Sequence, residues 1–338
     1  MAPRDHRAAY MAAAALVCNA AKYGFQPREI NHINCESLTV GMQMITTAEI
    51  HSAQARVADY VRRTPVLELE AGALFEGGIC SLKLEHFQHT GSFKVRGAFN
   101  ALLSSERPAG GVAAYSGGNH GAAVAYAATS LGLKSTIFVP DFAGPVKIGR
   151  MQNFGADVRV MDAPAAEIVA AFQRFARDNN ALAVHPYDDA LVLAGQGTLG
   201  LEMEEQLAGV DTVVLSVGGG GLLGGIGSWF GDRVNIIAVE SEGTATLATA
   251  LEKGIGSEIT PTGVAASALG AGSMGVMPME VVANTRTQSF TVSDQAIVEA
   301  QKRLWDRTRV VGEPGAATAL AVLTSGAYVP EKDERVCV

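Results

Sequence analysis

One lysine has the surroundings of a chemically active amine, in the sequence T-G-S-F-K-V-R-G at residues 90–97. Lys94 lies between an aromatic and a β-branched residue, and desolvation by such neighbours disfavours the charged ammonium form. A neutral lysine amine attacks carbonyls, which is what Schiff-base chemistry requires. A lysine in a surface loop would have no such role, so other segments have to decide between the two interpretations.

The second chemical feature is a run of four glycines at residues 218–221, between a predicted buried strand (211–217) and a helix predicted from Leu222. Glycines let the main chain approach a phosphate, and the amides at a helix N-terminus attract anions. No lysine follows the run, so it is not a nucleotide-triphosphate loop. Residues 219–224 do satisfy the dinucleotide fingerprint, with Glu240 about 20 residues further on. Taken alone, the run therefore fits a NAD site, a phosphate-ester cofactor, or simply tight packing of helix on sheet.

The polar turn S-G-G-N-H at residues 116–120 decides between these cofactors, because it follows a predicted strand at 112–115. A Schiff-base lysine, a polar turn at a strand end and an amide-lined phosphate cup together suit an aldehyde cofactor that carries a phosphate. That cofactor is pyridoxal 5′-phosphate (PLP), whereas a nicotinamide site needs no Schiff-base lysine.

Length and composition exclude several classes of protein. The 338 residues suffice for two domains, and 48% hydrophobic with 18% charged residues is typical of a globular chain. A net charge of −8 without a basic run argues against nucleic-acid binding, and no apolar stretch of the body is long enough to span a membrane. The scattered cysteines indicate reduced, cytosolic thiols, and His86 and His89 lack further metal ligands. The cysteines are Cys18, Cys35, Cys80 and Cys337.

Residues 1–43 differ from the rest of the chain. Arg4 and Arg7 precede an alanine-rich run, which has the outline of a secretory signal but is too weakly apolar for one. We expect a poorly ordered extension or a start-site artefact, with export as the alternative. The folded part is predicted to begin with a helix whose capping box is T-T-A-E at residues 46–49.

Strands and helices alternate along most of the remaining chain, which predicts parallel sheets with helical crossovers and an α/β fold. The predicted strands are 80–85, 112–115, 135–139, 158–161, 182–185, 211–217, 235–239 and 335–338. The predicted helices are 93–103, 121–131, 145–154, 165–177, 195–207, one from 222, 293–307 and 315–324.

Five motifs, in this order, resemble the PLP-dependent serine/threonine dehydratases: T-G-S-F-K-V-R-G, S-G-G-N-H, A-G-Q-G-T (194–198), V-G-G-G-G-L (217–222) and E-P (313–314). The resemblance covers residues 45–338. It implies the two-domain fold of type II PLP enzymes (tryptophan-synthase-β-like), shared with serine racemase and cysteine synthase, in which each domain is an open, mostly parallel sheet flanked by helices. The implied domains are a large PLP-binding domain (44–110 and 189–338) and a small mobile domain (111–188).

The resemblance also implies roles for individual residues. Lys94 would form the Schiff base and remove the proton from the substrate Cα, Asn119 would hydrogen-bond the phenolic oxygen of the cofactor, and Phe93 would pack beside its ring. The phosphate would be held by Gly218, Gly219, Gly220, Gly221 and Leu222. The substrate carboxylate would be received by Ser116, Gly117, Asn119 and His120. Read without the resemblance, Asn119 and His120 are ordinary turn residues.

The implied reaction is β-elimination, which converts a 3-hydroxy amino acid such as L-threonine or L-serine into a 2-oxo acid and ammonia. Racemisation and β-replacement on the same fold are the alternatives. Racemases of this family carry a second serine as the opposite-face acid/base, and Gly117 stands at that position. A glycine cannot move a proton, so the sequence favours elimination.

Two further positions depart from the family pattern. The family's last strand ends in a Ser, Thr or Cys that faces the pyridine nitrogen, and Cys337 lies too early to be that residue. We expect either that the sequence stops short of it or that the nitrogen meets water. Some relatives bind a cation through a Glu and an Asp six residues later. Glu240 matches the first position, but Thr246 occupies the second, so a metal site is only weakly indicated.

The sequence therefore predicts a cytoplasmic PLP-dependent lyase, a homodimer that acts on a small amino acid. An alternative from another class is a non-catalytic protein that binds the cofactor or an amino acid without turnover. A nicotinamide-dependent dehydrogenase is the last alternative.

Overall fold

The computed structural model describes residues 45–106 and 108–338. The prediction for residues 1–43 lies outside this part of the chain. Within it, no helix is long and apolar enough to cross a membrane. The predicted capping box is confirmed: Thr46 Oγ1 accepts from the amide of Glu49, whose carboxylate accepts in turn from the Thr46 amide.

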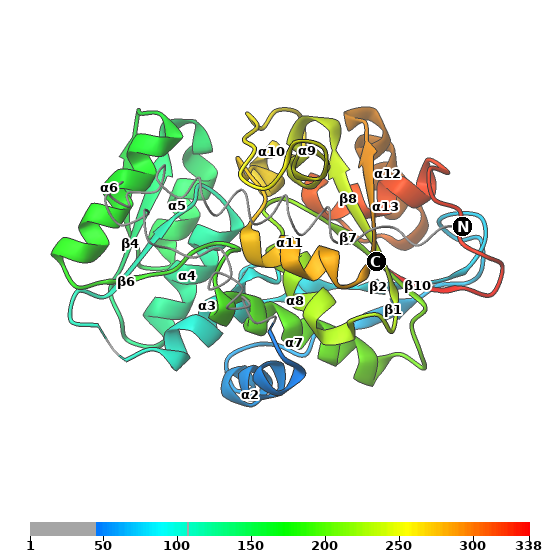
Figure 1. Ribbon diagram of the computed structural model, residues 1–338, viewed down its shortest axis with the longest axis horizontal. Coiled ribbons are helices and arrows are strands. Elements are labelled where there is room, and N and C mark those ends of the chain that lie inside the picture. Colours follow the sequence, from blue (N-terminus) through cyan, green and yellow to red (C-terminus); the bar gives the residue numbers. More distant parts are fainter. Residues whose placement is uncertain (1–44, 107) are drawn as a thin grey trace, which may run out of the picture.

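The described strands form two β-sheets, which lie side by side in Figure 1. The larger sheet has the order β1-β2-β10-β7-β8-β9 and is parallel except for the pair β1–β2. The smaller sheet, β5-β4-β3-β6, is parallel throughout. The strands are β1 (Val66–Glu68), β2 (Ile79–Lys83), β3 (Val112–Tyr115), β4 (Ser135–Pro140), β5 (Asp157–Met161), β6 (Leu182–Ala183), β7 (Thr212–Ser216), β8 (Asn235–Ser241), β9 (Arg286–Val292) and β10 (Arg335–Cys337).

Helices cover both sheets, as the alternating sequence predicts. They are α2 (Thr47–Val57), α3 (Lys94–Ser104), α4 (Asn119–Ser130), α5 (Pro145–Asn153), α6 (Ala165–Asp178), α7 (Ala190–Gln206), α8 (Gly221–Phe230), α9 (Thr246–Lys253), α10 (Ala266–Leu269), α11 (Val276–Ala283), α12 (Asp294–Thr308) and α13 (Pro314–Thr324). Short 3₁₀ turns are η3 (Glu85–Phe87), η4 (Asp141–Ala143) and η5 (Glu242–Thr244).

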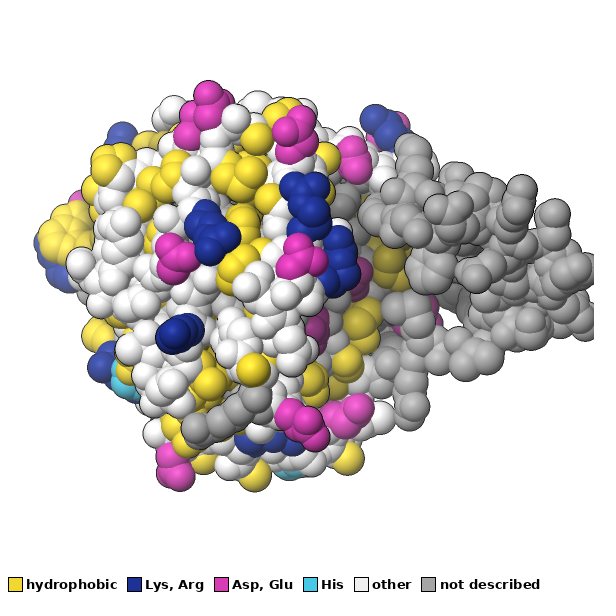
Figure 2. Space-filling model, turned by 90° about the vertical axis from the view of Figure 1, so that its left-hand side faces the viewer, with side chains coloured by type: hydrophobic (Ala, Val, Ile, Leu, Met, Phe, Trp, Pro, Cys, Tyr) yellow, Lys and Arg dark blue, Asp and Glu magenta, His cyan; other side chains and the backbone are white. Residues whose placement is uncertain are grey.

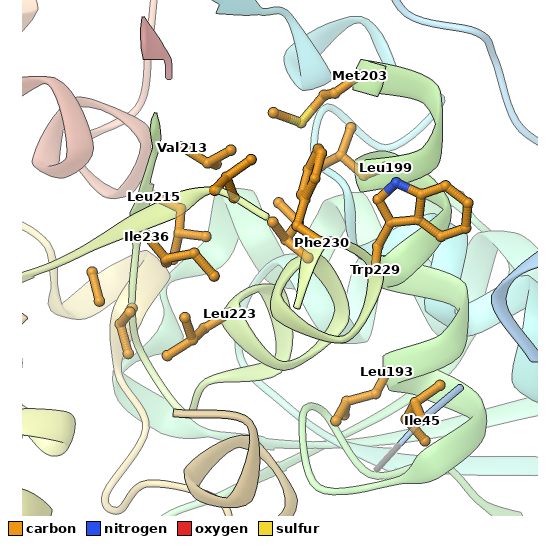
Figure 3. Packing of buried hydrophobic residues seen from close by; sticks show 14 of the residues in the cluster. Ile45, Leu193, Leu199, Met203, Val213, Leu215, Leu223, Trp229, Phe230 and Ile236 are labelled. Atoms are coloured by element: carbon orange, nitrogen blue, oxygen red, sulfur yellow. The ribbon is translucent and has the colours of Figure 1, made fainter. Parts of the chain in front are cut away.

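The larger sheet buries a separate core on each face, and the period of two along a strand divides its side chains between them. Val213 and Leu215 of β7 pack into the core beneath α2, α7 and α8, while Val214 between them packs into the core of α12 and α13. Figure 3 shows the first core, in which Trp229 and Phe230 of α8 meet residues of α7 and of the sheet. Both faces of β7 are therefore buried, which explains why its sequence is a continuous apolar run.

The smaller sheet is also covered on both faces. One core contains side chains of α4, α5 and β4 together with Phe99 of α3, and the other joins Phe138 to Ile168 and Phe172 of α6. Helix α3 thus packs against α4 and also against α7, and lies between the two sheets. Seen from this end of the molecule, Lys, Arg, Asp, Glu and apolar side chains are interspersed (Figure 2).

Most predicted elements are present, with shifted ends. Strand β3 has the predicted bounds, but α7 begins five residues earlier than expected because Asp189 caps it by accepting from the amides of Leu191 and Val192. The predictions missed β1 and β9 and the helices α9 to α11. Strand β1 has three residues, and β9 is a polar edge strand, so neither has a clear apolar period.

Candidate active site

Lys94 lies in the first turn of α3, as predicted, but the helix begins at Lys94 itself, one residue later than expected, and Phe93 is the N-cap. The Lys94 Nζ donates to the carbonyl oxygen of Pro186 at 2.7 Å and lies 5.3 Å from the centre of the Phe93 ring. Among the described residues, no carboxylate lies within ion-pair distance of this amine. Burial without a counter-charge lowers the pKa of Lys94 from 10.5 to about 8. The amine is therefore suited to attack an aldehyde near neutral pH.

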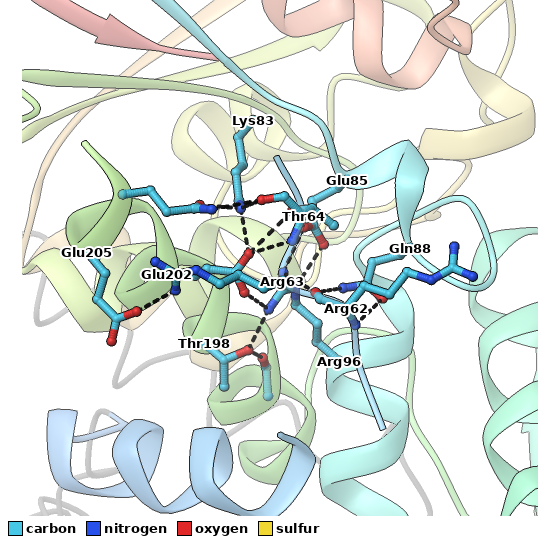
Figure 4. Close-up of polar contacts among 12 residues, drawn as sticks. Arg62, Arg63, Thr64, Lys83, Glu85, Gln88, Arg96, Thr198, Glu202 and Glu205 are labelled. Atoms are coloured by element: carbon cyan, nitrogen blue, oxygen red, sulfur yellow. Dashed lines mark hydrogen bonds and ion pairs between the residues drawn. The ribbon is translucent and has the colours of Figure 1, made fainter. Parts of the chain in front are cut away.

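Two residues further along α3, Arg96 is held in a buried ion-pair network (Figure 4). Its guanidinium donates to both carboxylate oxygens of Glu85 at 2.8 Å and to Glu202 at 3.0 Å. Glu202 of α7 also accepts from Lys83 of β2 at 2.6 Å. Burial alone would lower the pKa of Arg96, but the two carboxylates outweigh it and raise this pKa. The network connects the start of α3 to β2 and α7, and so holds Lys94 in position.

The glycine run joins β7 to α8. It packs so closely against other segments of the protein that its residues have no room for side chains. A Cβ on Gly219 would lie 2.3 Å from the Tyr187 ring, and one on Gly220 would lie 2.4 Å from the methyl group of Met274. Gly220 also has a φ of +92°, a left-handed conformation that favours glycine. The first amides of α8 have no intrahelical acceptor and bear the positive end of its dipole, so they are able to bind an anion.

Lys94 and the glycine run meet through one connecting segment. Pro186 accepts from the Lys94 amine, and its neighbour Tyr187 lies against Gly219 and Gly221. A Cβ on Gly221 would be 3.0 Å from Tyr187 Cβ. The segment H-P-Y-D-D (185–189) lies between β6 and α7, and it was not predicted to belong to the site. The parallel topology gives a reason, because this segment follows β6 at the carboxyl edge of the smaller sheet.

The predicted polar turn lies at the carboxyl end of β3, and α4 begins within it at Asn119. Ser116 Oγ accepts from the amide of Gly118 at 3.1 Å. His120 Nε2 lies 3.1 Å from the carbonyl oxygen of Val184. Burial, aided by the charge of Lys94, lowers the pKa of His120 to about 3, so this imidazole is neutral at physiological pH. The turn thus presents neutral polar groups near Lys94.

A further residue joins this turn to the larger sheet. Asn119 Nδ2 donates to Glu313 Oε1 at 2.7 Å, and Glu313 is the N-cap of α13. Glu313 belongs to the E-P motif, for which no role was predicted. Its only local signal was an acidic residue before the proline at the first position of a helix.

The candidate metal residue Glu240 is buried at the end of β8. Its carboxylate accepts from Thr246 Oγ1 at 3.0 Å, from the Leu247 amide at 2.7 Å and from the Ala248 amide at 2.9 Å. The Thr246 hydroxyl is also hydrogen-bonded to the carbonyl oxygen of Gly218. Glu240 thereby connects the start of α9 with the glycine run, and in the described part of the chain no three His, Cys, Asp or Glu residues are grouped to hold a metal ion.

Cys337 lies in the last strand, between β2 and β7. It is paired in register with Val213, whereas β7 continues to Ser216 before the glycine run begins. That Cys337 is too early in the strand to reach the cofactor stays a prediction.

The residues present fit PLP. A buried amine without a counter-ion suits the aldehyde, and a side-chain-free, amide-lined helix start suits the phosphate. Two buried polar atoms beside these groups, Ser92 Oγ and His120 Nδ1, have no hydrogen-bond partner among the described residues. Buried polar atoms of this kind are expected in a site that is completed by a ligand.

Two mostly parallel β-sheets flanked by helices, with a buried lysine at the start of one helix and a glycine run at the start of another, are the features of the type II class of PLP enzymes. The chain belongs to the family of pyridoxal-phosphate dependent enzymes, whose model matches residues 57–338. It is 34% identical over 289 residues to the catabolic L-threonine dehydratase of Staphylococcus aureus strain N315, covering 84% of each chain.

Solved structures agree with this family. A threonine deaminase from T.th. is 34% identical, with a TM-score of 0.79 over 86% of this chain and 96% of that one. Maize serine racemase is 29% identical, with a TM-score of 0.80 over 87% of this chain and 92% of that one. The predicted fold class and cofactor family are thus confirmed.

Proposed function

We propose that this protein is a PLP-dependent ammonia-lyase that converts a 3-hydroxy amino acid, such as L-threonine or L-serine, into a 2-oxo acid and ammonia. The observation that carries the proposal is the Lys94 amine, buried without a counter-charge and bonded only to Pro186 among the described residues. The S. aureus threonine dehydratase and the T.th. threonine deaminase support this choice of reaction.

When bound, the cofactor supplies a π-system that accepts the negative charge developing at the substrate Cα. Lys94 would hold the cofactor through its aldehyde, and the Lys94 amine would take the proton from the substrate Cα. The proposed phosphate ligands are Gly218, Gly219, Gly220, Gly221 and the amide of Leu222, with Phe93 beside the cofactor ring.

The polar turn would receive the substrate. Ser116, Gly117, Asn119 and His120 lie at the carboxyl end of β3, where the Ser116 hydroxyl and the backbone amides at the start of α4 can donate to a carboxylate. The neutral His120 ring already donates through Nε2 to Val184, so it would contribute through its backbone amide. The hydroxyl on the substrate Cβ leaves with a proton as water. Addition of water to the remaining unsaturated product gives the 2-oxo acid and ammonia, which balances the reaction.

Racemisation is the second candidate, because maize serine racemase is a structural relative. It requires an acid/base on each face of the substrate. Gly117 has no such group, and a Cβ built there would lie 2.8 Å from the Ala143 Cβ. A serine at this position would force η4 to move, so the local packing as well as the sequence favours one-sided elimination.

We further propose the domain division expected from the sequence, with a large domain of residues 44–110 and 189–338 and a small mobile domain of residues 111–188. The two sheets with their own cores support this division. A homodimer in the cytoplasm is also proposed. The buried free thiols of Cys80 and Cys337 are compatible with a reducing compartment.

An absorption spectrum with added PLP tests the proposal, followed by addition of L-threonine or L-serine. We expect a protein-bound band that changes with substrate, together with equal amounts of 2-oxo acid and ammonia. A D-amino acid as main product would favour the racemase, and a band without turnover would favour the binding-only alternative. Absence of any band with Lys94 intact would contradict the cofactor assignment.

A further inference from the structure

One hydrogen bond joins helices that cover the two different sheets. It involves Asn119, the residue expected to bond to the phenolic oxygen of the cofactor. Asn119 begins α4, which covers the smaller sheet, and Glu313 precedes α13, which covers the larger one. Asn119 Nδ2 donates to Glu313 Oε1 at 2.7 Å, across 194 residues of sequence. The Glu313 side chain makes no capping bond to its own helix, so α13 does not require this carboxylate.

This hydrogen bond fixes the orientation of the Asn119 side-chain amide, with its NH₂ group toward Glu313. An ionised carboxylate only accepts hydrogen bonds, so Glu313 selects the NH₂ group of the amide and not its oxygen. The NH₂ group has a second hydrogen that remains available to another acceptor. Without Glu313, the amide could turn over and present its oxygen, which would oppose another oxygen rather than bond to it.

Two cations of α5 act on the same carboxylate through their charges. Burial raises the pKa of Glu313, and the bond from Asn119 and the charges of Lys147 and Arg150, both on the side of the smaller sheet, offset this only in part. Lys147 Nζ donates to the carbonyl oxygen of Ser267 at 2.6 Å, and Arg150 donates to that of Thr90. Glu313 therefore lies where several contacts join the two sides of the site, and only part of its side chain is exposed to solvent.

We propose that Glu313 is a positioning residue, which fixes the amide of Asn119 so that one Nδ2 hydrogen is left for the phenolic oxygen of PLP. This inference rests on the proposed function. It assigns a role to a residue outside the set of lysine, glycines and turn residues, and it acts through Asn119 rather than on the substrate.

The test compares Glu313→Ala, Glu313→Gln, Asn119→Ala and the double variant Glu313→Ala/Asn119→Ala. Glu299→Gln, an exposed position of α12, is the matched control. Two quantities are measured on each folded chain: the Kd for PLP, by titration of the cofactor-free protein, and the pH at which the bound cofactor's absorption band changes. The second quantity reports the charge on the phenolic oxygen, which a merely structural role would leave unmoved.

For Glu313→Ala we expect about tenfold weaker PLP binding, the loss of one hydrogen bond to a charged group, and a band that changes at a higher pH. Glu313→Gln retains an acceptor for Asn119 and should show a smaller change of both quantities. Because Glu313 acts through Asn119, the double variant should be no worse than Asn119→Ala alone. The control should match the wild type.

Additive losses in the double variant, or unchanged binding and titration in both Glu313 variants, would overturn the proposal. Glu313→Gln keeps the shape of the side chain, so the test remains decisive even if Glu313→Ala fails to fold. The wild-type titration separates the two levels of inference: a wild type that does not bind PLP rejects the proposed function, whereas normal wild-type binding with unaffected variants rejects only the role of Glu313.

Discussion

Lys94 and Arg96 are two cations on one turn of α3, and the protein treats them in opposite ways. The Lys94 amine has one carbonyl partner and no carboxylate, and its pKa falls to about 8. The Arg96 guanidinium is fully buried but bonded to two carboxylates, and its pKa rises. Burial is common to both, so the counter-charge decides the outcome.

The difference separates reactivity from anchoring. A buried cation without a partner is destabilised in its charged form and becomes a base or nucleophile. A buried cation whose carboxylate partners come from η3 and α7 holds those two elements to α3, because leaving any of these charges unpaired is costly. The first turn of the same helix thus contains both a chemically active residue and the residue that keeps it in place.

The largest expected effect comes from removing the active member of the pair. Lys94→Ala should lower the rate of ammonia release by roughly 10³-fold or more, because both the Schiff base and the Cα base are lost. The free energy of unfolding of the cofactor-free chain should stay the same or rise, because an uncompensated charge has been removed. A steady-state ammonia assay and urea unfolding measure the two quantities, with Lys302→Ala, an exposed lysine of α12, as the control.

Lys94→Arg sharpens this experiment, since arginine keeps the charge but does not deprotonate. We expect it to be as inactive as the alanine variant. Substantial turnover by either variant would show that another residue supplies the base.

The anchoring member of the pair should behave in the reverse manner. Glu202→Ala leaves Arg96 and Lys83 without a shared carboxylate and is expected to lower the free energy of unfolding by about 3–5 kcal/mol. The neighbouring Glu205→Ala breaks only the exposed pair with Arg63 and should cost less than about 1 kcal/mol. Denaturant unfolding of both variants measures the contrast on one helix. Equal losses would mean that the Arg96 network does not anchor α3.

The pH dependence of cofactor capture tests the lowered pKa of Lys94. Only the neutral amine attacks the aldehyde, so the capture rate should rise about tenfold per pH unit below pH 8 and level off above it. Between pH 8 and 10.5 the unfolded chain binds more protons at this group than the folded one, so the contribution of Lys94 to stability should increase with pH. Stopped-flow absorbance of PLP binding gives the profile. A midpoint near the ordinary value of 10.5 would contradict the buried, unpaired environment.

The reactive member of this comparison could be predicted from the sequence, because its signals are local. Each of three motifs is made of residues that are close together in the sequence. The motifs are the apolar neighbours of Lys94, the four glycines after an apolar strand, and the polar turn after β3. Their chemistry resides in the backbone or in a single side chain, so they are recognisable without any knowledge of tertiary contacts. The alternation of strands and helices then places them at the carboxyl ends of parallel strands, where they meet.

The anchoring network could not be predicted in the same way. Arg96 and Glu202 are 106 residues apart, and Asn119 and Glu313 are 194 apart, so only the folded chain shows that they meet. The segment that joins Lys94 to the glycine run, Pro186 and Tyr187, was missed for a similar reason: a backbone carbonyl and a packing ring have no sequence signature. Strands β1 and β9 were missed because short or polar edge strands lack an apolar period.

Glu240 extends the comparison to a buried carboxylate without a cation, and a smaller effect than at Glu202 is expected there. Neighbouring cations hold the pKa of Glu202 below its ordinary value although burial opposes them, whereas burial raises the pKa of Glu240, whose partners are a hydroxyl and amides. Glu240→Gln keeps one oxygen for Thr246 and the Leu247 amide but places an NH₂ group opposite the Ala248 amide, so it should lower the free energy of unfolding by about 1–3 kcal/mol. Because Glu240 already accepts from three groups, neither EDTA nor added Mg²⁺ should shift the melting temperature or the rate of ammonia release. Stabilisation of the wild type by Mg²⁺ that is lost in Glu240→Gln would reveal a cation site at this carboxylate and contradict the hydrogen-bonded role given to it.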